Sequence, residues 1–389
     1  MAELSPLALI GLFRYLQNEV YGTICPFVWD QCGDFGCYIE PEEDQRYGLS
    51  DLWEDADEFF VRDKDFDKKA TEELRKNVTF NLYYANNPKQ FETAMIGTNP
   101  LYKNFAKNKI TKIIVHGWKN NHQSEIGQGI KDAYIKAKTN ANIIIVDWSN
   151  GSFRFYNRAK ACVPLVANIL AEFIDRLVKE QGLNVKNLHI IGHSLGAHVS
   201  GLAAVRVKAG KPKRVTGLDP AKPTFDNKDT EKISKNSGDF VDIIHSCANR
   251  LGLSERLGHI DFYPNRGEAL QRGCLTDYDG SCSHARSYQI FAEAVTNPKG
   301  FKGTLCNNWE DFRGGKCKSG AVQYIGEAIP AKYVEGAYYL KTAKNAPLAV
   351  GEQSSVMSAQ EIKEDDEDSV LAKMLFKVFK PYYILYQNK

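Results

Sequence analysis

No stretch of the 389-residue sequence is long and apolar enough to span a bilayer, and no block of basic residues is present. A transmembrane helix needs about 20 consecutive apolar residues, and proteins that bind nucleic acids concentrate Lys and Arg on one surface. The formal net charge here is only +2. We therefore expect neither a membrane-spanning protein nor one that binds nucleic acid.

The histidine-rich cysteine patterns that hold zinc are also missing, although nine cysteines are present. Cys274 with Cys282 and Cys306 with Cys317 form close pairs, which is typical of small disulfide loops. The odd total leaves at least one thiol without an intrachain partner. The sequence assigns no partners to the remaining five, which are Cys25, Cys32, Cys37, Cys162 and Cys247.

The stretch LHIIGHSLGAHVSG, residues 188–201, predicts a strand, a sharp turn and a helix. A turn of this kind strains the backbone of its middle residue, so the flanking positions must be small. Gly192 and Gly196 flank Ser194 in this way. The turn would project the Ser194 hydroxyl above the edge of a sheet, and we interpret Ser194 as a nucleophile.

A serine hydroxyl attacks only when a base takes its proton, so Ser194 predicts a carboxylate and a histidine later in the chain. Asp219 ends the apolar run VTGLD, and Pro220 stops the strand there. The carboxylate would then lie at the carboxyl end of a strand, where sites in such sheets collect. We therefore prefer Asp219 to its competitors, which are Asp226, Asp229, Asp239, Asp242 and Asp261.

The candidate bases are His245, His259 and His284. His245 and His259 border the apolar runs VDIIH and HIDFY, a position typical of core histidines that backbone groups satisfy. His284 opens a predicted helix after a cysteine-bounded loop, and loops on a rigid scaffold often carry catalytic side chains. We assign the base to His284.

The oxyanion of an acyl transfer needs backbone N–H donors. In hydrolases with this turn, one donor is the residue after the nucleophile, which is Leu195, and the other follows an earlier strand. The run ITKIIVHGW, residues 110–118, fits that strand and makes Trp118 the second donor. A buried aromatic residue after a turn would give the same HGW motif, and both interpretations can hold.

Apolar runs alternate with helical periods through the middle of the chain, with strands predicted at IVHGW, NIIIVDW, HIIGH, RVTGLD and DFVDIIH. Helices are predicted at residues 124–138 and 159–180, with Pro164 in the first turn of the second and Gly182 after it. This alternation predicts an α/β fold, with a mostly parallel central sheet and helices on both faces.

The motifs IVHGW, GHSLGAH, GLDPAKP, VDIIH, GHIDFYPN and CSHARSY follow one another in a characteristic order. Over residues 78–339 they resemble the animal pancreatic lipase family, which includes lipoprotein lipases and secreted phospholipases A1. The resemblance implies an α/β-hydrolase fold and a lipid substrate at an interface. It places the family's triad on Ser194, Asp219 and His284, and its oxyanion donors on Trp118 and Leu195.

The close cysteine pairs also resemble disulfides of that family, Cys274–Cys282 in the lid and Cys306–Cys317 after it. They support an oxidising, extracellular setting. In that setting Asn77 and Asn150, each followed by a Ser or Thr two residues later, are glycosylation acceptors. Residues 4–13, LSPLALIGLF, are apolar like an export signal, but Glu3 replaces the expected positive start.

The sequence departs from the family in the lid, because Cys274 and Cys282 enclose only seven residues, LTDYDGS. The segment between His245 and His259 also resembles the shorter form of the phospholipase A1 branch, whose open site admits a polar head group. We expect phospholipase A1-type release of a fatty acid through an acyl-enzyme, with triacylglycerol lipase as the alternative. A catalytically silent lipid-binding or yolk-type storage protein is the rival from another class, although such relatives usually lose triad members.

No metal or cofactor is expected. Some family members bind calcium through clustered acids before the VDIIH-like strand, but here that segment is TEKISKNSGDFVD. Ser234 and Ser237 stand about where carboxylates would be needed, and calcium requires several oxygen ligands with compensating charge. The serine mechanism itself requires no metal.

We expect three parts in the chain. Residues 1–75 form an acidic, cysteine-containing and partly disordered extension, since residues 40–73 carry fourteen acids against five bases. Residues 76–347 form the hydrolase domain. Residues 348–389 form an acidic linker and an amphipathic helix that either lies on a lipid surface or docks on the body. Too few residues follow Pro347 for the β-sandwich domain that many vertebrate members append, so we expect none.

Overall fold

The computed structural model describes residues 62, 64–85, 87–225, 230–274, 277, 279–317, 319–330, 332–355 and 357–358. The early cysteines, the apolar segment at residues 4–13 and the predicted C-terminal helix lie outside these residues. Asp226 and Asp229 also lie outside them.

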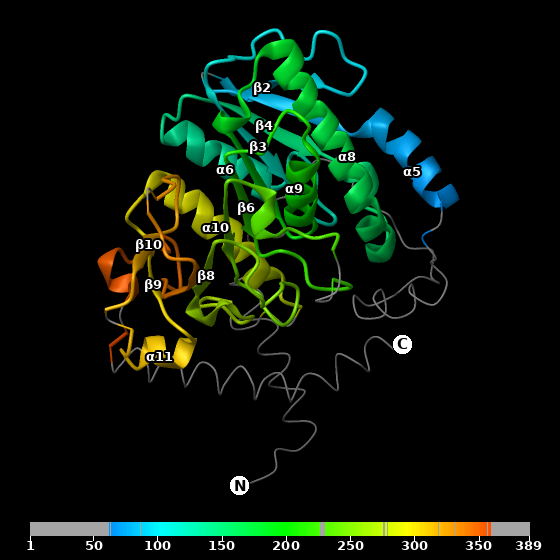
Figure 1. Ribbon diagram of the computed structural model, residues 1–389. Helices are drawn as coiled ribbons and strands as arrows, with labels where there is room; N and C mark the ends of the chain where they lie inside the picture. Colours follow the sequence, from blue (N-terminus) through cyan, green and yellow to red (C-terminus); the bar gives the residue numbers. More distant parts are fainter. Residues whose placement is uncertain are drawn as a thin grey trace, which may run out of the picture. The chain divides into compact units, whose positions relative to one another are not determined.

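Within the described residues, eleven strands form one sheet in the order β10-β9-β11-β8-β7-β6-β5-β3-β4-β1-β2 (Figure 1). The strands are β1 (Thr79–Tyr84), β2 (Asn87–Ala94), β3 (Ile110–Val115), β4 (Ala141–Asp147), β5 (Leu188–His193), β6 (Arg214–Leu218), β7 (Phe240–Ile244), β8 (Ile260–Pro264), β9 (Lys302–Leu305), β10 (Val322–Tyr324) and β11 (Gly336–Leu340). All neighbours from β4 to β11 are parallel, and antiparallel pairs extend both ends. The mostly parallel sheet is therefore confirmed.

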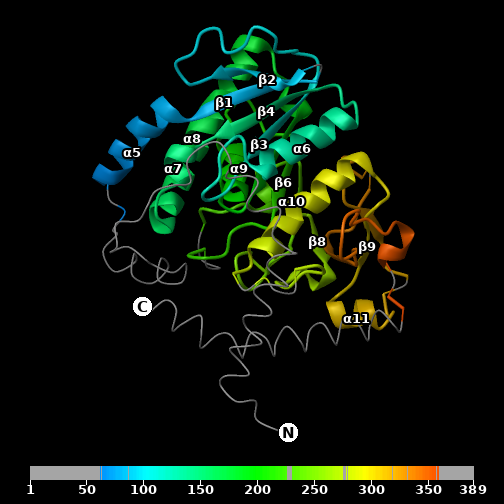
Figure 2. The ribbon, with the colours of Figure 1, turned by 180° about the vertical axis from the view of Figure 1, so that it is seen from behind.

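Helices cover both faces of this sheet, as the front and back views show (Figures 1 and 2). The helices are α5 (Lys64–Asn77), α6 (Glu125–Lys136), α7 (Ser149–Ser152), α8 (Tyr156–Gln181), α9 (Leu195–Arg206), α10 (Ser281–Thr296) and α11 (Trp309–Arg313). The buried side chains of α5, α8 and α9 belong to one apolar cluster and those of α6 and α10 to another.

Strand β3 shows how one apolar run supplies both clusters. Successive side chains of a strand point to opposite faces. Ile113 and Val115 accordingly pack with α8 and α9, whereas Ile114 packs with α6 and α10. A strand buried on both faces must be apolar throughout, which explains why the central strands were predictable from sequence.

Helix α8 begins at Tyr156 rather than residue 159, and Pro164 lies inside it, so the placement of Pro164 in the first turn was wrong. An internal proline removes one helical hydrogen bond. Helix α8 tolerates this loss because it spans 26 residues and buries a long apolar face, including Tyr156 in its first turn. Gly182 ends the helix with φ 70°, as predicted.

The last part of the predicted N-terminal extension contains helix α5 (Lys64–Asn77), which the sequence did not indicate. Its residues Ala70 and Leu74 are buried in the core. Acidic residues lie in its first turn and basic ones in its last, an order that the helix dipole favours. The acidic composition concealed this amphipathic helix.

A buried polar ladder joins the central strands to a late segment of the chain. Lys112 of β3 contacts the carboxylate of Glu327 and lies 3.2 Å from Nδ1 of His189. The other end of the ladder is Arg214, which donates two hydrogen bonds to Asp242 and two to the carbonyls of residues 326 and 327. Residues after 320 are thus bound to the sheet by charge as well as by packing.

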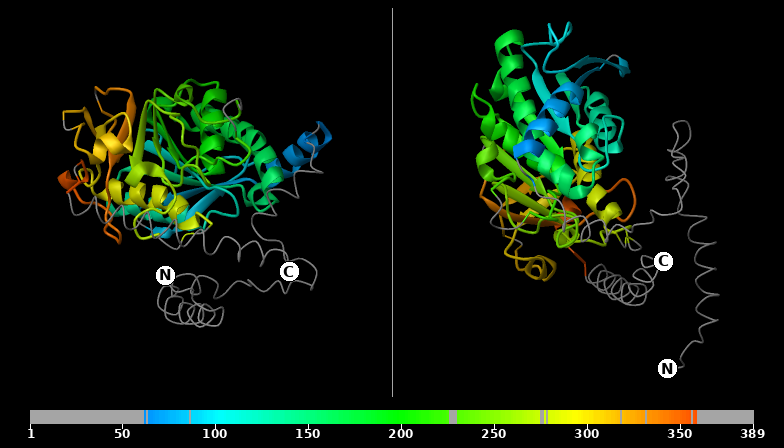
Figure 3. Two further views of the ribbon diagram at one scale, coloured as in Figure 1. Left: turned by 90° about the horizontal axis from the view of Figure 1, so that it is seen from below. Right: turned by 90° about the vertical axis from the view of Figure 1, so that its right-hand side faces the viewer.

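The early strands β1 and β2 and the late strands β9 and β10 lie at opposite ends of the sheet (Figure 3). The carboxyl ends of β3, β5, β6 and β7 meet between them along one edge. No helix of the described residues is long and apolar enough to cross a membrane.

Candidate active site

Ser194 lies in the turn between β5 and α9, with φ 58° and ψ −125°. Few non-glycine residues adopt a positive φ, and such strain is concentrated at functional sites. A Cβ atom on Gly192 would lie 2.1 Å from the carbonyl oxygen of Gly196, and one on Gly196 would lie 2.3 Å from that of Val115. Both positions therefore require glycine, for the reason that the sequence motif suggested.

Asp219 follows β6 and is fully buried, with φ 44°. Its Oδ1 accepts hydrogen bonds from the backbone N–H groups of Ser246 at 2.7 Å and Cys247 at 3.0 Å. A Cβ atom on Gly252 would lie 2.4 Å from the same oxygen. Two amide donors compensate the loss of water around the buried carboxylate. Nothing in the sequence marked residues 246, 247 and 252 as its supports.

His284 belongs to the first turns of α10, and its Nδ1 lies 2.5 Å from Oδ2 of Asp219. A carboxylate only accepts hydrogen bonds, so Nδ1 carries the proton and Nε2 remains the basic nitrogen. The backbone carbonyl of His284 accepts a hydrogen bond from the Ser287 hydroxyl at 2.9 Å. The structure thus brings Asp219 and His284 together, as the sequence interpretation required.

His193 connects the nucleophile turn to α10. Its Nε2 lies 3.2 Å from the carbonyl oxygen of His284, and the two rings are 4.3 Å apart between centroids. Burial, aided by repulsion from His284, holds the pKa of His193 well below its usual value. His193 is therefore a neutral donor at physiological pH, and it links the residue before Ser194 to the backbone of the candidate base.

The competing residues have other partners. His245 is buried between Asp261 and the carbonyl of Leu253, and Nδ1 of His259 accepts the N–H of Val241. Both have hydrogen-bond partners, as their positions beside apolar runs suggested, and His245 is fully buried whereas His259 is partly buried. The carboxylates of Asp242 and Asp239 pair with Arg214 and Lys186.

One predicted oxyanion donor follows the nucleophile in the chain, and the other lies on a loop that passes close to it. Leu195 begins α9 directly after Ser194. A Cβ atom on Gly117 would lie 2.7 Å from Cβ of Ser194, so the loop that carries Trp118 passes directly against the nucleophile. The indole N–H of Trp118 donates to the carbonyl of Arg154 at 2.8 Å, which ties its side chain to the segment after α7.

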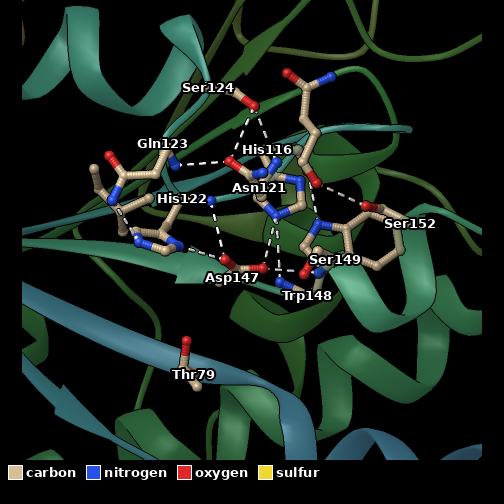
Figure 4. Close-up of polar contacts among 12 residues, drawn as sticks. Thr79, His116, Asn121, His122, Gln123, Ser124, Asp147, Trp148, Ser149 and Ser152 are labelled. Carbon is tan, nitrogen blue, oxygen red and sulfur yellow. Dashed lines mark hydrogen bonds and ion pairs between the residues drawn. The ribbon is translucent and has the colours of Figure 1, made fainter. Parts of the chain in front are cut away.

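Asp147, at the end of β4, anchors the same loop (Figure 4). Its Oδ2 accepts from the backbone N–H of His122 at 3.1 Å and lies 2.5 Å from Nδ1 of that ring, while Oδ1 accepts from the N–H of Ser149. Burial alone would raise the pKa of Asp147, but hydrogen bonds from His116, His122 and Ser149 hold it well below its usual range. Asp147 was missed, although it ends the run NIIIVD much as Asp219 ends VTGLD.

The short segment between Cys274 and Cys282 is tied down where the structure describes it. Those two cysteines are bonded, as are Cys306 and Cys317. Asp277 accepts from the N–H groups of Cys282 at 3.0 Å and residue 283 at 2.7 Å, so its carboxylate caps α10. The carbonyl of Asp277 accepts from Arg250 at 3.0 Å, which connects the lid segment to the neighbouring short loop.

The other two described cysteines are buried, and the two predicted glycosylation sites are exposed. Cys162 and Cys247 are buried free thiols that do not meet in a disulfide, and burial raises the pKa of Cys162 to about 11. Asn77 and Asn150 are exposed. Ser234 and Ser237, considered above for a calcium site, form a capping box on a short 3₁₀ turn, in which each serine side chain accepts the backbone N–H of the other.

The parallel sheet, its two helical layers and the strained turn after β5 define an α/β-hydrolase. The sequence model of the Lipase family matches residues 50–348, and the chain belongs to that family. The resemblance drawn from six motifs is therefore confirmed, and the family match begins before the predicted domain boundary at residue 76.

Known relatives share about a third of their aligned residues with this chain. It is 33% identical over 264 residues to human (Homo sapiens) pancreatic lipase-related protein 2, covering 61% of this chain and 55% of that protein. It is 31% identical over 265 residues to pancreatic triacylglycerol lipase of Myocastor coypus, covering 62% and 57%. For the Sus scrofa enzyme of that name the identity is 31% over 302 residues, covering 69% and 66%. The chain thus spans a little over half the length of the first two relatives.

Proposed function

We propose that this protein is a lipid carboxylic-ester hydrolase with Ser194 as nucleophile, His284 as base and Asp219 as the orienting acid. Membership of the Lipase family supports the reaction class. The observation that carries the residue assignment is the 2.5 Å contact between Asp219 and His284 beside a strained serine turn. No metal takes part in this mechanism.

In the proposed reaction, Nε2 of His284 takes the hydroxyl proton of Ser194 as the oxygen attacks the ester carbonyl. Asp219 holds the imidazole in the required tautomer and stabilises the imidazolium. The amides of Trp118 and Leu195 bind the oxyanion. His284 then gives its proton to the departing alkoxide, and the same steps with water release the fatty acid from the acyl-enzyme.

Substituting Ser194→Ala tests the proposal. We expect hydrolysis of a soluble short-chain ester to be lost while the unfolding temperature is unchanged. The proposed mechanism uses the Ser194 hydroxyl for attack on the ester and not for holding the fold together. An alkyl phosphonate ester should label the unaltered protein and not the variant. Retained turnover in the variant would contradict the assignment, and a folded native protein that neither reacts nor labels would favour a silent lipid-binding protein.

For the substrate we propose phospholipase A1-type cleavage. A lid segment of seven residues is too short to shield a wide apolar cleft, and its Asp277 is bonded to Arg250 and to the start of α10. An open site would leave room for a polar head group. Fatty-acid release from phosphatidylcholine should therefore exceed release from trioctanoylglycerol.

Triacylglycerol hydrolysis is the second candidate, because two of the relatives reported above are named pancreatic triacylglycerol lipases. The same pair of substrates decides between the candidates. Faster release from trioctanoylglycerol would overturn the phospholipase proposal and leave the triad proposal intact.

We also propose that the protein works outside the cell. Two disulfides, Cys274–Cys282 and Cys306–Cys317, support this location because such bonds persist in oxidising compartments. Glycan attachment at Asn77 and Asn150 would follow from export, and mass spectrometry of the protein secreted from a eukaryotic host tests it.

A further inference from the structure

Phe153 and Phe155 are the most exposed large apolar side chains in the part of the chain that the structure describes, at 56% and 57%. They flank Arg154 in the turn between α7 and α8. We call these three residues the aromatic turn. Exposed apolar clusters on a soluble domain often mark a surface that another phase or molecule covers.

Hydrogen bonds of Arg154 hold the backbone of the aromatic turn in place. The guanidinium of Arg154 donates to Glu73 of α5 at 2.6 Å and to the carbonyl of Asn150 at 3.1 Å. The carbonyl of Arg154 accepts the indole N–H of Trp118 at 2.8 Å. Because the backbone between the two phenylalanines is fixed, covering their rings would cost little ordering entropy.

The turn is also bonded to the loop that passes the nucleophile. The carbonyl of Ser152 accepts the N–H of Lys119 at 3.0 Å, and its hydroxyl donates to the carbonyl of Asn120 at 2.9 Å. Ser152 lies beside the residues of that loop in the close-up view (Figure 4). The segment that carries the exposed rings is therefore joined, through the two hydrogen bonds of Ser152, to the loop that touches Ser194.

Exposed basic side chains belong to the two segments that adjoin the aromatic turn, the loop bonded to Ser152 and the start of α8. Lys119 is exposed, and its Nζ lies 4.6 Å from the centre of the Trp118 ring. Arg158, one helical turn beyond Phe155, is exposed as well. Aromatic rings that enter the interface, beside cations that meet anionic head groups, are the combination that peripheral lipid-binding surfaces use.

We propose that Phe153 and Phe155 insert into an anionic lipid surface and bring against it the edge of the sheet that carries the candidate active site. This inference rests on the proposed function, since a hydrolase of lipids must reach its substrate in such a surface. It adds the location of the contact, which no sequence motif indicated. Lys119 and Arg158 add attraction to the phosphate groups of the surface.

The test measures binding without turnover, in the full-length Ser194→Ala protein. Vesicles of equal parts phosphatidylcholine and phosphatidylglycerol are sedimented with this protein and with the same protein carrying Phe153→Ser and Phe155→Ser. We expect the partition coefficient to fall about tenfold on loss of both rings. We also expect weaker binding to vesicles of phosphatidylcholine alone.

A matched control carries Val205→Ser and Val334→Ser, which remove two apolar side chains that are each 52% exposed. Val205 lies at the end of α9 and Val334 before β11, so both are at the opposite edge of the sheet. Equal loss in the control and the aromatic-turn variant would overturn the proposal, as would undiminished binding in the latter. Light scattering that showed a dimer broken by the aromatic-turn substitutions would assign the surface to a second copy of the chain instead. Hydrolysis of a soluble ester by the unaltered protein tests the proposed function separately.

Discussion

Two buried imidazole–carboxylate pairs lie close together in this molecule, yet only one of them has a free basic nitrogen. His284 contacts Asp219 through Nδ1 and leaves Nε2 as the base. His245 contacts Asp261 through Nε2 and the carbonyl of Leu253 through Nδ1. The side chain of His284 is 12% exposed and that of His245 is fully buried. A His–Asp pair is thus a candidate for chemistry only where one ring nitrogen remains available to a substrate.

The two pairs are also connected. His245 directly precedes Ser246 and Cys247, whose N–H groups hold Asp219. The fully buried pair His245–Asp261, the inner pair, therefore fixes the backbone that supports the outer pair, His284–Asp219. We expect changes in the outer pair to affect turnover and changes in the inner pair to affect folding.

Asp219→Asn should give the largest effect. A neutral amide cannot stabilise the imidazolium and favours the wrong tautomer of His284, so kcat/KM for a soluble ester should fall about 10⁴-fold. Steady-state kinetics with urea unfolding as a parallel measurement checks this. Asp239→Asn, which removes an exposed carboxylate paired with Lys186, is the control and should change neither. A loss below tenfold in Asp219→Asn would remove that residue from the mechanism.

His245→Ala should chiefly destabilise the fold. The change removes the imidazole from the buried Asp261 carboxylate, which keeps only the N–H groups of Leu257 and Gly258, and it leaves a cavity; together these losses should cost about 3 to 5 kcal/mol. Urea unfolding followed by tryptophan fluorescence measures it. His259→Ala, which removes an acceptor of one backbone hydrogen bond, should cost only about 1 kcal/mol. Full stability with lost turnover in His245→Ala would instead place the inner pair in the chemistry.

Asp147→Asn should weaken the oxyanion loop by a smaller amount. The amide keeps the shape of the carboxylate but loses the charge that attracts His122 and the N–H of Ser149. We expect kcat to fall about tenfold with KM nearly unchanged, because the loop acts on the developing oxyanion rather than on the bound ester. Asp132→Asn on the exposed side of α6 is the control. An increase in KM alone would mean that Asp147 shapes substrate binding.

The smallest expected effect is on the pH dependence of stability. The pKa of His193 lies well below its usual value of 6.5 because of burial and the neighbouring His284. The unfolded chain binds a proton below that pH and the folded chain does not, so the free energy of unfolding should fall as the pH drops below 6.5. His193→Gln should make this decline shallower by about 1 kcal/mol between pH 7 and pH 5. Urea unfolding across that range measures both slopes, and identical slopes would exclude a contribution from His193.

Much of the fold followed from sequence because the central strands are buried on both faces and leave uninterrupted apolar runs. Helix α5 was missed because it lies at the end of an acidic segment and its charged residues outnumber its two buried positions, Ala70 and Leu74. The start of α8 was missed because Pro164 suggested a first turn, whereas the long buried face sets the true start.

The residues of the candidate triad could be proposed from the sequence, but the groups that hold them in place could not. Ser194, Asp219 and His284 each follow a recognisable local pattern of strand end or helix start. The groups that hold Asp219 are the backbone amides of Ser246 and Cys247, and a backbone amide cannot be recognised in a sequence. Of the supporting residues named here, only Asp147 could have been found from the sequence, because it is an acid at the end of a predicted strand.

The buried ladder from Lys112 to Arg214 has a consequence for shortened forms of the chain. Burial lowers the pKa of Lys112, and the carboxylate of Glu327 opposes that effect. A premature stop between His284 and Glu327 would leave buried Lys112 without its carboxylate partner and Arg214 without the two carbonyl acceptors of residues 326 and 327. Such fragments should fail to fold and be degraded, even though every residue of the proposed triad is still present in them.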